Sequence, residues 1–160
     1  MKSFDSRVYS INDFVEWSKN EQLELNPFFQ RRPVWSEKAK SYLMDTIVRG
    51  KPIPKIFIRQ KINVSTKSSF REVVDGQQRL KAIIDFAEDR LVLSKRAQEF
   101  RGLKYSTLSE DQKGEFLEYA IAVDSLVNAS TDDVLEVFAR LNSYTVSLLT
   151  CSPLSEQVRV

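Results

Sequence analysis

Histidine is absent from the 160-residue sequence, and cysteine occurs once, at Cys151. Without an imidazole, the chain lacks a histidine general base and a histidine ligand for zinc, which excludes an HNH-type nuclease centre within it. A single cysteine excludes an intramolecular disulfide and a cysteine zinc cluster. Any chemistry in this chain must therefore use carboxylate, amide and guanidinium groups.

Long apolar runs and a signal-peptide pattern are also missing, so we expect a cytoplasmic protein without a membrane partner. The net charge of +2 is too small to predict nucleic-acid binding by itself. A length of 160 residues, 42% of them hydrophobic, is typical of one globular domain with a buried core.

Capping residues and apolar spacing predict about five helices separated by short strands. Four helices are expected to begin after serine N-caps, at Ser10, Ser36, Ser109 and Ser130. A fifth follows Gly76 and extends to about Asp89. Strands are expected at 23–25, 55–60, 70–74 and 119–123, with 55–60 and 70–74 paired antiparallel across an exposed polar loop at 61–69. This mixture, which does not alternate strictly, predicts an α+β (mixed α/β) fold.

The strand-to-helix junction at residues 75–79 is the most informative feature. Its sequence is Asp75-Gly76-Gln77-Gln78-Arg79. Such a junction exposes backbone N–H groups and the positive end of a helix dipole, and phosphate binds readily there. Gly76 allows close approach of a ligand, Arg79 offers a planar fork for phosphate oxygens, and the two glutamines offer donors and acceptors. Asp75 is a candidate to hold a metal ion, a water or a ribose hydroxyl.

A structural interpretation of the same five residues stays open. Asp-Gly is common in turns, and Asp75 would then only cap the helix through its side chain. Gln77 and Arg79 would then be solvated surface residues.

A second polar segment, Gln30-Arg31-Arg32, lies close in sequence to Trp35. Its amide and guanidinium groups are candidates for gripping phosphate, and Trp35 is a candidate for stacking on a base. The alternative is that the aromatic residues belong to the core and the arginines extend to solvent.

Four motifs in this order resemble a known family, the N-terminal domain of GmrSD-type modification-dependent restriction endonucleases, which carries a DGQQR signature. They are Phe29–Trp35, Gly50–Ile58, Val74–Leu80 and Phe138–Asn142. The resemblance extends over residues 10–148.

The resemblance implies a compact ParB/sulfiredoxin-like fold that binds a nucleotide and, in several members, hydrolyses it during DNA restriction in anti-phage defence. It implies that the hydrolysis motif is Asp75, Gly76, Gln77, Gln78 and Arg79, and that Gln30 and Arg31 contact phosphate. We accordingly expect a Mg²⁺-dependent nucleoside triphosphatase, with Mg²⁺ held by Asp75. The implied partners are DNA and a separate nuclease domain or subunit. The nuclease is expected to be separate because the family's nuclease depends on histidine, and this chain has none.

The end of the chain departs from the family pattern. Residues 1–148 fit the domain, whereas 149–160 do not, and we hypothesise a truncation or a shifted reading frame near Leu148. A non-catalytic module that binds DNA or protein through the same fold remains the alternative function.

Overall fold

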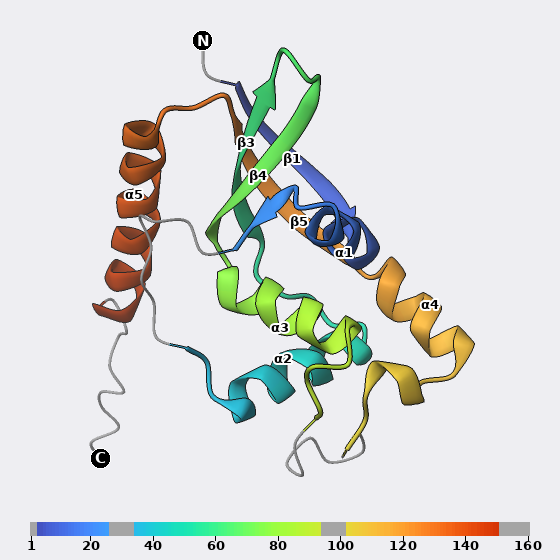
Figure 1. Cartoon of the computed structure of the whole chain (residues 1–160). Coiled ribbons are helices and arrows are strands. Elements are labelled where there is room, and N and C mark those ends of the chain that lie inside the picture. Colours follow the sequence, from blue (N-terminus) through green and yellow to red (C-terminus); the bar gives the residue numbers. More distant parts are fainter. Residues whose placement is uncertain (1–2, 26–33, 94–101, 151–160) are drawn as a thin grey trace, which may run out of the picture. The chain divides into compact units, whose positions relative to one another are not determined.

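A five-stranded mixed sheet organises the first part of the chain (Figure 1). The computed structural model describes residues 3–25, 34–93 and 102–150, and it divides the chain into one unit that ends at Ala129 and another that begins at Ser130. The strand order is β1-β5-β3-β4-β2, in which β1–β5 and β3–β4 are antiparallel and β5–β3 and β4–β2 are parallel. The strands are β1 (Ser3–Ser10), β2 (Leu23–Glu24), β3 (Ile56–Asn63), β4 (Ser68–Asp75) and β5 (Ala120–Val127).

Five α-helices occur in the described residues, and serine N-caps start four of them as predicted. Ser10, Ser36 and Ser109 each accept a hydrogen bond from the backbone N–H of the third helical residue, which satisfies one of the donors left open at a helix start. The helices are α1 (Ile11–Lys19), α2 (Glu37–Val48), α3 (Gln77–Ala87), α4 (Glu110–Glu118) and α5 (Thr131–Thr150), with a short 3₁₀ helix, η2 (Tyr105–Thr107).

The main core lies between one face of the sheet and helices α1 to α4. Apolar side chains from all four helices join the inward-facing residues of β3, β4 and β5 in one buried cluster. The strand residues in it are Ile56, Ile58, Val73, Ile121 and Val123. Burial of this face supplies the main driving force for folding and fixes where β4 meets α3.

Two parts of the sheet differ from expectation. Strand β1 was not predicted, because Phe4 and Val8 on it face outward and its pattern does not signal a buried face. The segment 61–69, expected as a loop, is largely strand, and only residues 64–67 form the turn. Backbone pairing continues there between β3 and β4, and the exposed polar side chains gave no alternation to detect.

The second unit contains α5. Ser130 accepts a hydrogen bond from the backbone N–H of Asp133, and Asp133 accepts one from the Ser130 N–H at 2.9 Å. Asp132 and Asp133 place negative charge in the first turn, where the helix dipole favours it. This start agrees with the predicted cap.

Arg71 on β4 stacks on Trp17 of α1, with the guanidinium carbon 3.8 Å from the ring centroid. Burial lowers the pKa of Arg71, although Tyr9 and Asp13 partly offset the shift. Trp17 also packs edge-on against Tyr9 and Phe14. The cluster ties α1 to the sheet.

A buried ion pair joins β3 to β4. The Arg59 side chain is 1% exposed, and its Nε donates to Glu72 Oε2 at 2.6 Å. Lys61 approaches the other Glu72 oxygen at 3.0 Å. Arg59 also donates to the carbonyl of Ala129, the last residue of the first unit, at 3.5 Å. This guanidinium therefore links two strands to the point where the first unit ends.

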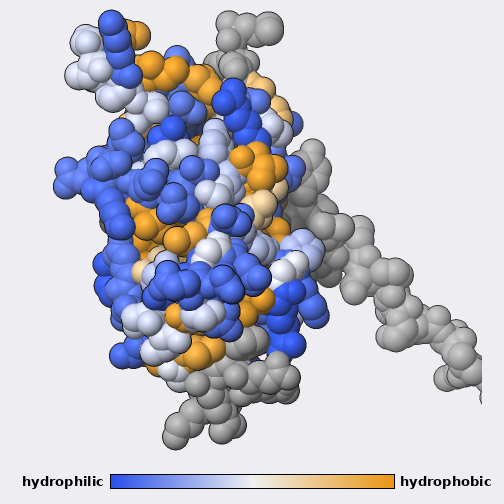
Figure 2. Space-filling model, turned by 90° about the vertical axis from the view of Figure 1, so that its right-hand side faces the viewer, coloured by the Kyte–Doolittle hydropathy of each residue, from blue (hydrophilic) through white to orange (hydrophobic). Residues whose placement is uncertain are grey.

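On the face that Figure 2 shows, hydrophilic residues surround several apolar patches. Isolated exposed apolar residues are normal in folded proteins. The α+β class and the five helices agree with the sequence prediction. The ParB/sulfiredoxin-like topology and the 1–148 domain boundary stay predictions.

Replacing Arg59 by alanine should lower the free energy of unfolding by about 3 kcal/mol, because Glu72 would remain buried with only Lys61 to balance it. Urea denaturation measures this change. The double variant Arg59→Met/Glu72→Leu should recover most of the loss, since it removes both buried charges. A loss near 0.5 kcal/mol, the scatter of surface substitutions, would show that the pair does not stabilise the sheet.

Candidate functional site

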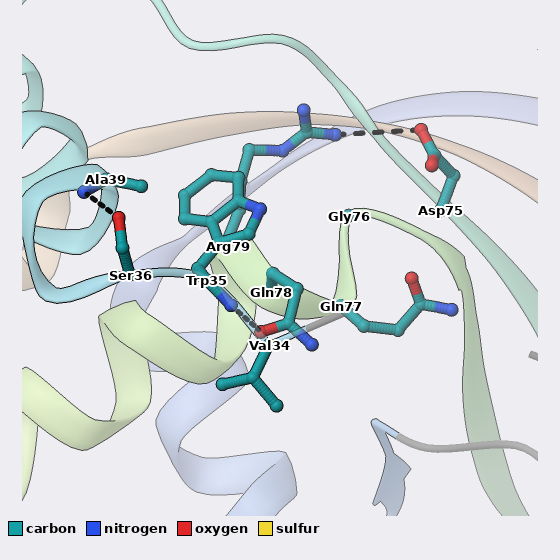
Figure 3. A pocket seen from close by; sticks show the side chains of 9 residues that line it. All are labelled: Val34, Trp35, Ser36, Ala39, Asp75, Gly76, Gln77, Gln78 and Arg79. Carbon is teal, nitrogen blue, oxygen red and sulfur yellow. Dashed lines mark hydrogen bonds and ion pairs between the residues drawn. The ribbon is translucent and has the colours of Figure 1, made fainter. Parts of the chain in front are cut away.

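A pocket of about 390 Å³ opens where β4 meets α3, and it is lined from two segments far apart in the chain (Figure 3). One segment is residues 75–79, and the other is the start of α2 with the residues before it. The lining residues are Val34, Trp35, Ser36, Ala39, Asp75, Gly76, Gln77, Gln78 and Arg79. This volume lies in the range of small-ligand sites.

Gly76 makes the junction possible. Its φ of +98° lies in the left-handed region, which a residue with a side chain rarely adopts. A Cβ at this position would overlap Ile56 Cδ1 and lie 3.0 Å from Arg79 Nη2. Gly76 is the N-cap of α3 and offers no side chain to cap it. The first N–H groups of α3 therefore lie at the pocket without a capping side chain from this residue.

Arg79 is held in place from two directions. Its Nη2 donates to the carbonyl of Lys55 at 3.0 Å and lies 3.7 Å from Asp75 Oδ2. The side chain is 15% exposed, so its charge is only partly screened by water. Lys55 immediately precedes β3, so the arginine links the start of β3 to the end of β4. The guanidinium is oriented before any ligand arrives.

The two glutamines of the motif have different surroundings. Gln77 is buried, and its Nε2 donates to the carbonyls of Val73 and Val74 at 3.0 and 3.2 Å. Gln78 is half-buried, and its Oε1 accepts from the backbone N–H of Trp35 at 3.3 Å. Gln77 therefore fastens α3 to β4, whereas Gln78 joins the two segments that line the pocket.

Asp75 is the one carboxylate among the described lining residues. Mg²⁺ at nucleotide sites is commonly held by one or two carboxylates together with phosphate oxygens and water. A single carboxylate beside Arg79 fits a Mg²⁺ ion that arrives with phosphates better than an ion bound by the protein alone. Within the described ranges, no group of three or more histidine, cysteine, aspartate or glutamate residues could hold a metal.

A second polar cluster holds the side chain of Lys55, whose backbone carbonyl accepts from Arg79. The Lys55 ammonium lies 2.6 Å from Asp124 Oδ2, and the Ser6 hydroxyl donates to Asp124 Oδ1 at 2.6 Å. Burial opposes ionisation of Asp124, but Lys55 and Ser6 together outweigh it and hold the pKa of this carboxyl below its ordinary value. Asp124 thus anchors the residue whose carbonyl receives Arg79.

The model of the GmrSD restriction endonuclease N-terminal domain matches residues 11–151. This chain belongs to that family. The family associates the chain with a restriction system, in which DNA and a nuclease domain are the expected context. No curated protein and no solved structure matches the chain significantly. None of the described helices has the length and apolar character needed to cross a membrane.

In this GmrSD-family chain, the structure brings together Trp35 and all five residues of the predicted motif. Gln30, Arg31 and Arg32 lie outside the described residues. Lys55 and Asp124 were not predicted as site residues. No sequence signal could identify Lys55 as the acceptor for Arg79, because it acts through its backbone carbonyl.

Gly76→Ala should lower the free energy of unfolding by about 2 kcal/mol or more, because alanine meets both a left-handed backbone and Ile56. Thermal and urea denaturation measure the effect. Gly114→Ala is the matched control, because a Cβ at Gly114 in α4 meets nothing within 4 Å. The control should stabilise the protein by about 0.5–1 kcal/mol. Equal effects at the two positions would contradict the constraint at Gly76.

Asp124→Asn should make the stability less sensitive to acid. A carboxyl whose pKa is lowered by folding stabilises the folded state above its unfolded pKa, and this contribution is lost as the pH falls through the folded value. The loss should therefore occur below about pH 4. Denaturation midpoints of the wild type and of Asp124→Asn should be measured from neutral to acidic pH. The two midpoints should differ at neutral pH and converge in acid. Curves that stay parallel would refute the role of this carboxylate.

Proposed function

We propose that the pocket at the start of α3 binds the phosphate groups of a nucleoside triphosphate. The observation that carries this proposal is that an oriented arginine and the N-terminus of α3 line one pocket of about 390 Å³. Helix N–H groups and the helix dipole favour an anion. A guanidinium adds a charge and a planar set of donors for phosphate oxygens.

The same residues support hydrolysis of the nucleotide. Phosphoryl transfer depends on positioning and on neutralising charge more than on covalent chemistry. Arg79 would neutralise phosphate oxygens, while Asp75 would orient the attacking water or contribute a ligand to Mg²⁺. Gln78 is the better placed of the two glutamines to orient that water, because Gln77 is buried with its amide bonded to β4 carbonyls. We assign Gln77 a positioning role. None of these roles requires histidine.

Trp35 supplies an aromatic surface at the same pocket, and we propose that it contacts the base or ribose. It is half-buried and packs against the core, so its position is set before a ligand binds. In this proposal the chain senses or hydrolyses a nucleotide for a restriction system whose DNA-cutting activity resides in a separate nuclease domain or subunit. Gln30, Arg31 and Arg32 remain candidates for additional phosphate contacts.

Arg79→Ala should weaken nucleotide binding by about 10-fold or more, because it removes a charge-assisted contact to phosphate. Mg²⁺ complexes of ATP, GTP, CTP and UTP should each be tested by thermal shift, isothermal titration and phosphate release. At the same concentration, nucleotide should raise the melting temperature of the wild type more than that of Arg79→Ala. Arg79→Lys should retain weak binding, since it keeps the charge but loses the planar fork.

Lys81→Ala is the matched control, because Lys81 lies on the same helix and pairs with Asp85 outside the pocket. It removes one positive charge and should leave nucleotide binding unchanged. Full binding and turnover by a folded Arg79→Ala protein would overturn the assignment. If DNA rather than nucleotide stabilises the wild type, with an affinity that falls steeply as salt rises, the chain is instead a DNA-binding module.

A further inference from the structure

Strand β1 lies at one edge of the sheet. It pairs with β5 at all eight positions, Ser3 to Ser10, without a shift in register. Among the described residues, no strand pairs with its other edge. The opposite edge of the sheet differs, because β2 there contains only two residues. A long regular edge strand exposes unpaired N–H and C=O groups to another strand.

Few of the devices that block edge pairing are present in β1. It has no proline and no bulge, and its only charged residues are Asp5 and Arg7, which cancel. The two form an ion pair within the strand. On the other face, Phe4 is 61% exposed and Val8 is 66% exposed. One face of the strand therefore carries the exposed apolar residues Phe4 and Val8, and the other face carries one charge of each sign.

We propose that β1 pairs antiparallel with β1 of a second copy of this chain, about a two-fold axis at Ser6. In this register each Asp5 lies opposite Arg7 of the second copy, and each Phe4 lies opposite Val8 of the second copy. Both kinds of cross-strand pair stabilise an antiparallel sheet. The interface is isologous, which is the commonest arrangement of a homodimer.

Charge selects this register over its neighbours. Side chains alternate across a strand, so a register that keeps the apolar face together can slip only in steps of two residues. A slip one way centres the axis on Asp5 and places two carboxylates opposite each other. A slip the other way centres it on Arg7 and places two guanidinium groups opposite each other. Both slipped registers are disfavoured by like charges.

The apolar side of the paired edge continues into the sheet. Phe4 packs against Phe57 of β3, with the ring centroids 6.5 Å apart. Pairing would cover Phe4 with Val8 of the second copy and would join two five-stranded sheets edge to edge. This interaction surface is separate from the pocket, because it uses none of the pocket's lining residues.

Charge reversal in the full-length chain tests the register. Sedimentation velocity from micromolar to millimolar concentration should give a monomer–dimer equilibrium for the wild type. Asp5→Arg and Arg7→Asp each create two like-charge pairs across the axis and should weaken the dimer by about 10-fold or more. The double variant Asp5→Arg/Arg7→Asp restores both pairs and should dimerise within about threefold of wild type. Circular dichroism and melting temperature establish that each variant is folded.

A cysteine at position 6 tests the axis independently, because residue 6 faces its own copy only in this register. In a Cys151→Ser background, Ser6→Cys should form a disulfide-linked dimer on mild oxidation. Val8→Cys is the matched control and should form little, since it faces Phe4 of the second copy. A chain that is monomeric throughout the series overturns the proposal. So does a dimer that resists both single reversals or is not trapped through position 6.

Discussion

The left-handed backbone of Gly76 is the constraint on which the pocket depends. It turns the chain from β4 into α3 within one residue, so the first N–H groups of α3 come to lie beside the end of the sheet. Any side chain at this position would enter space that Ile56 of the core occupies. The turn is therefore fixed by the same packing that holds the sheet against the helices. A junction of this kind keeps helix N–H groups available without a capping side chain, which is the condition that anion binding requires.

The polar groups that contact the pocket are themselves held in place by a second set of polar groups behind them. Arg79 is oriented by a backbone carbonyl and by Asp75, and the residue that provides the carbonyl is anchored through Asp124 and Ser6. Gln77 meanwhile fastens the helix to the strand from which it departs. All five residues of the motif line the pocket, and Gln77 and Arg79 also hold neighbouring segments in place. Guanidinium, amide and carboxylate groups therefore meet at one pocket in a chain that contains no histidine.

Local signals in the sequence predicted much of this structure. The serine caps were found because a cap is a contact within four residues, and the strand-to-helix junction because its glycine and flanking periodicities are adjacent in the chain. Strand β1 escaped detection because Phe4 and Val8 face outward, so its pattern resembles no buried strand. The burial of Gln77 and the bond from Arg79 to Lys55 depend on how distant segments pack. No pattern in a single sequence specifies such contacts. The different surroundings of Gln77 and Gln78 became visible only in the structure.

The positions of the two tryptophans have an optical consequence. The chain contains only two such residues. Trp35 forms part of the pocket wall, whereas Trp17 lies beneath the guanidinium of Arg71 in the cluster that joins α1 to the sheet. Indole emission responds to polarity and to nearby charge, so the two residues report on separate regions of the protein. Replacing Trp17 by phenylalanine would leave a single tryptophan, at the pocket, and its selectively excited emission would follow events there without an attached dye.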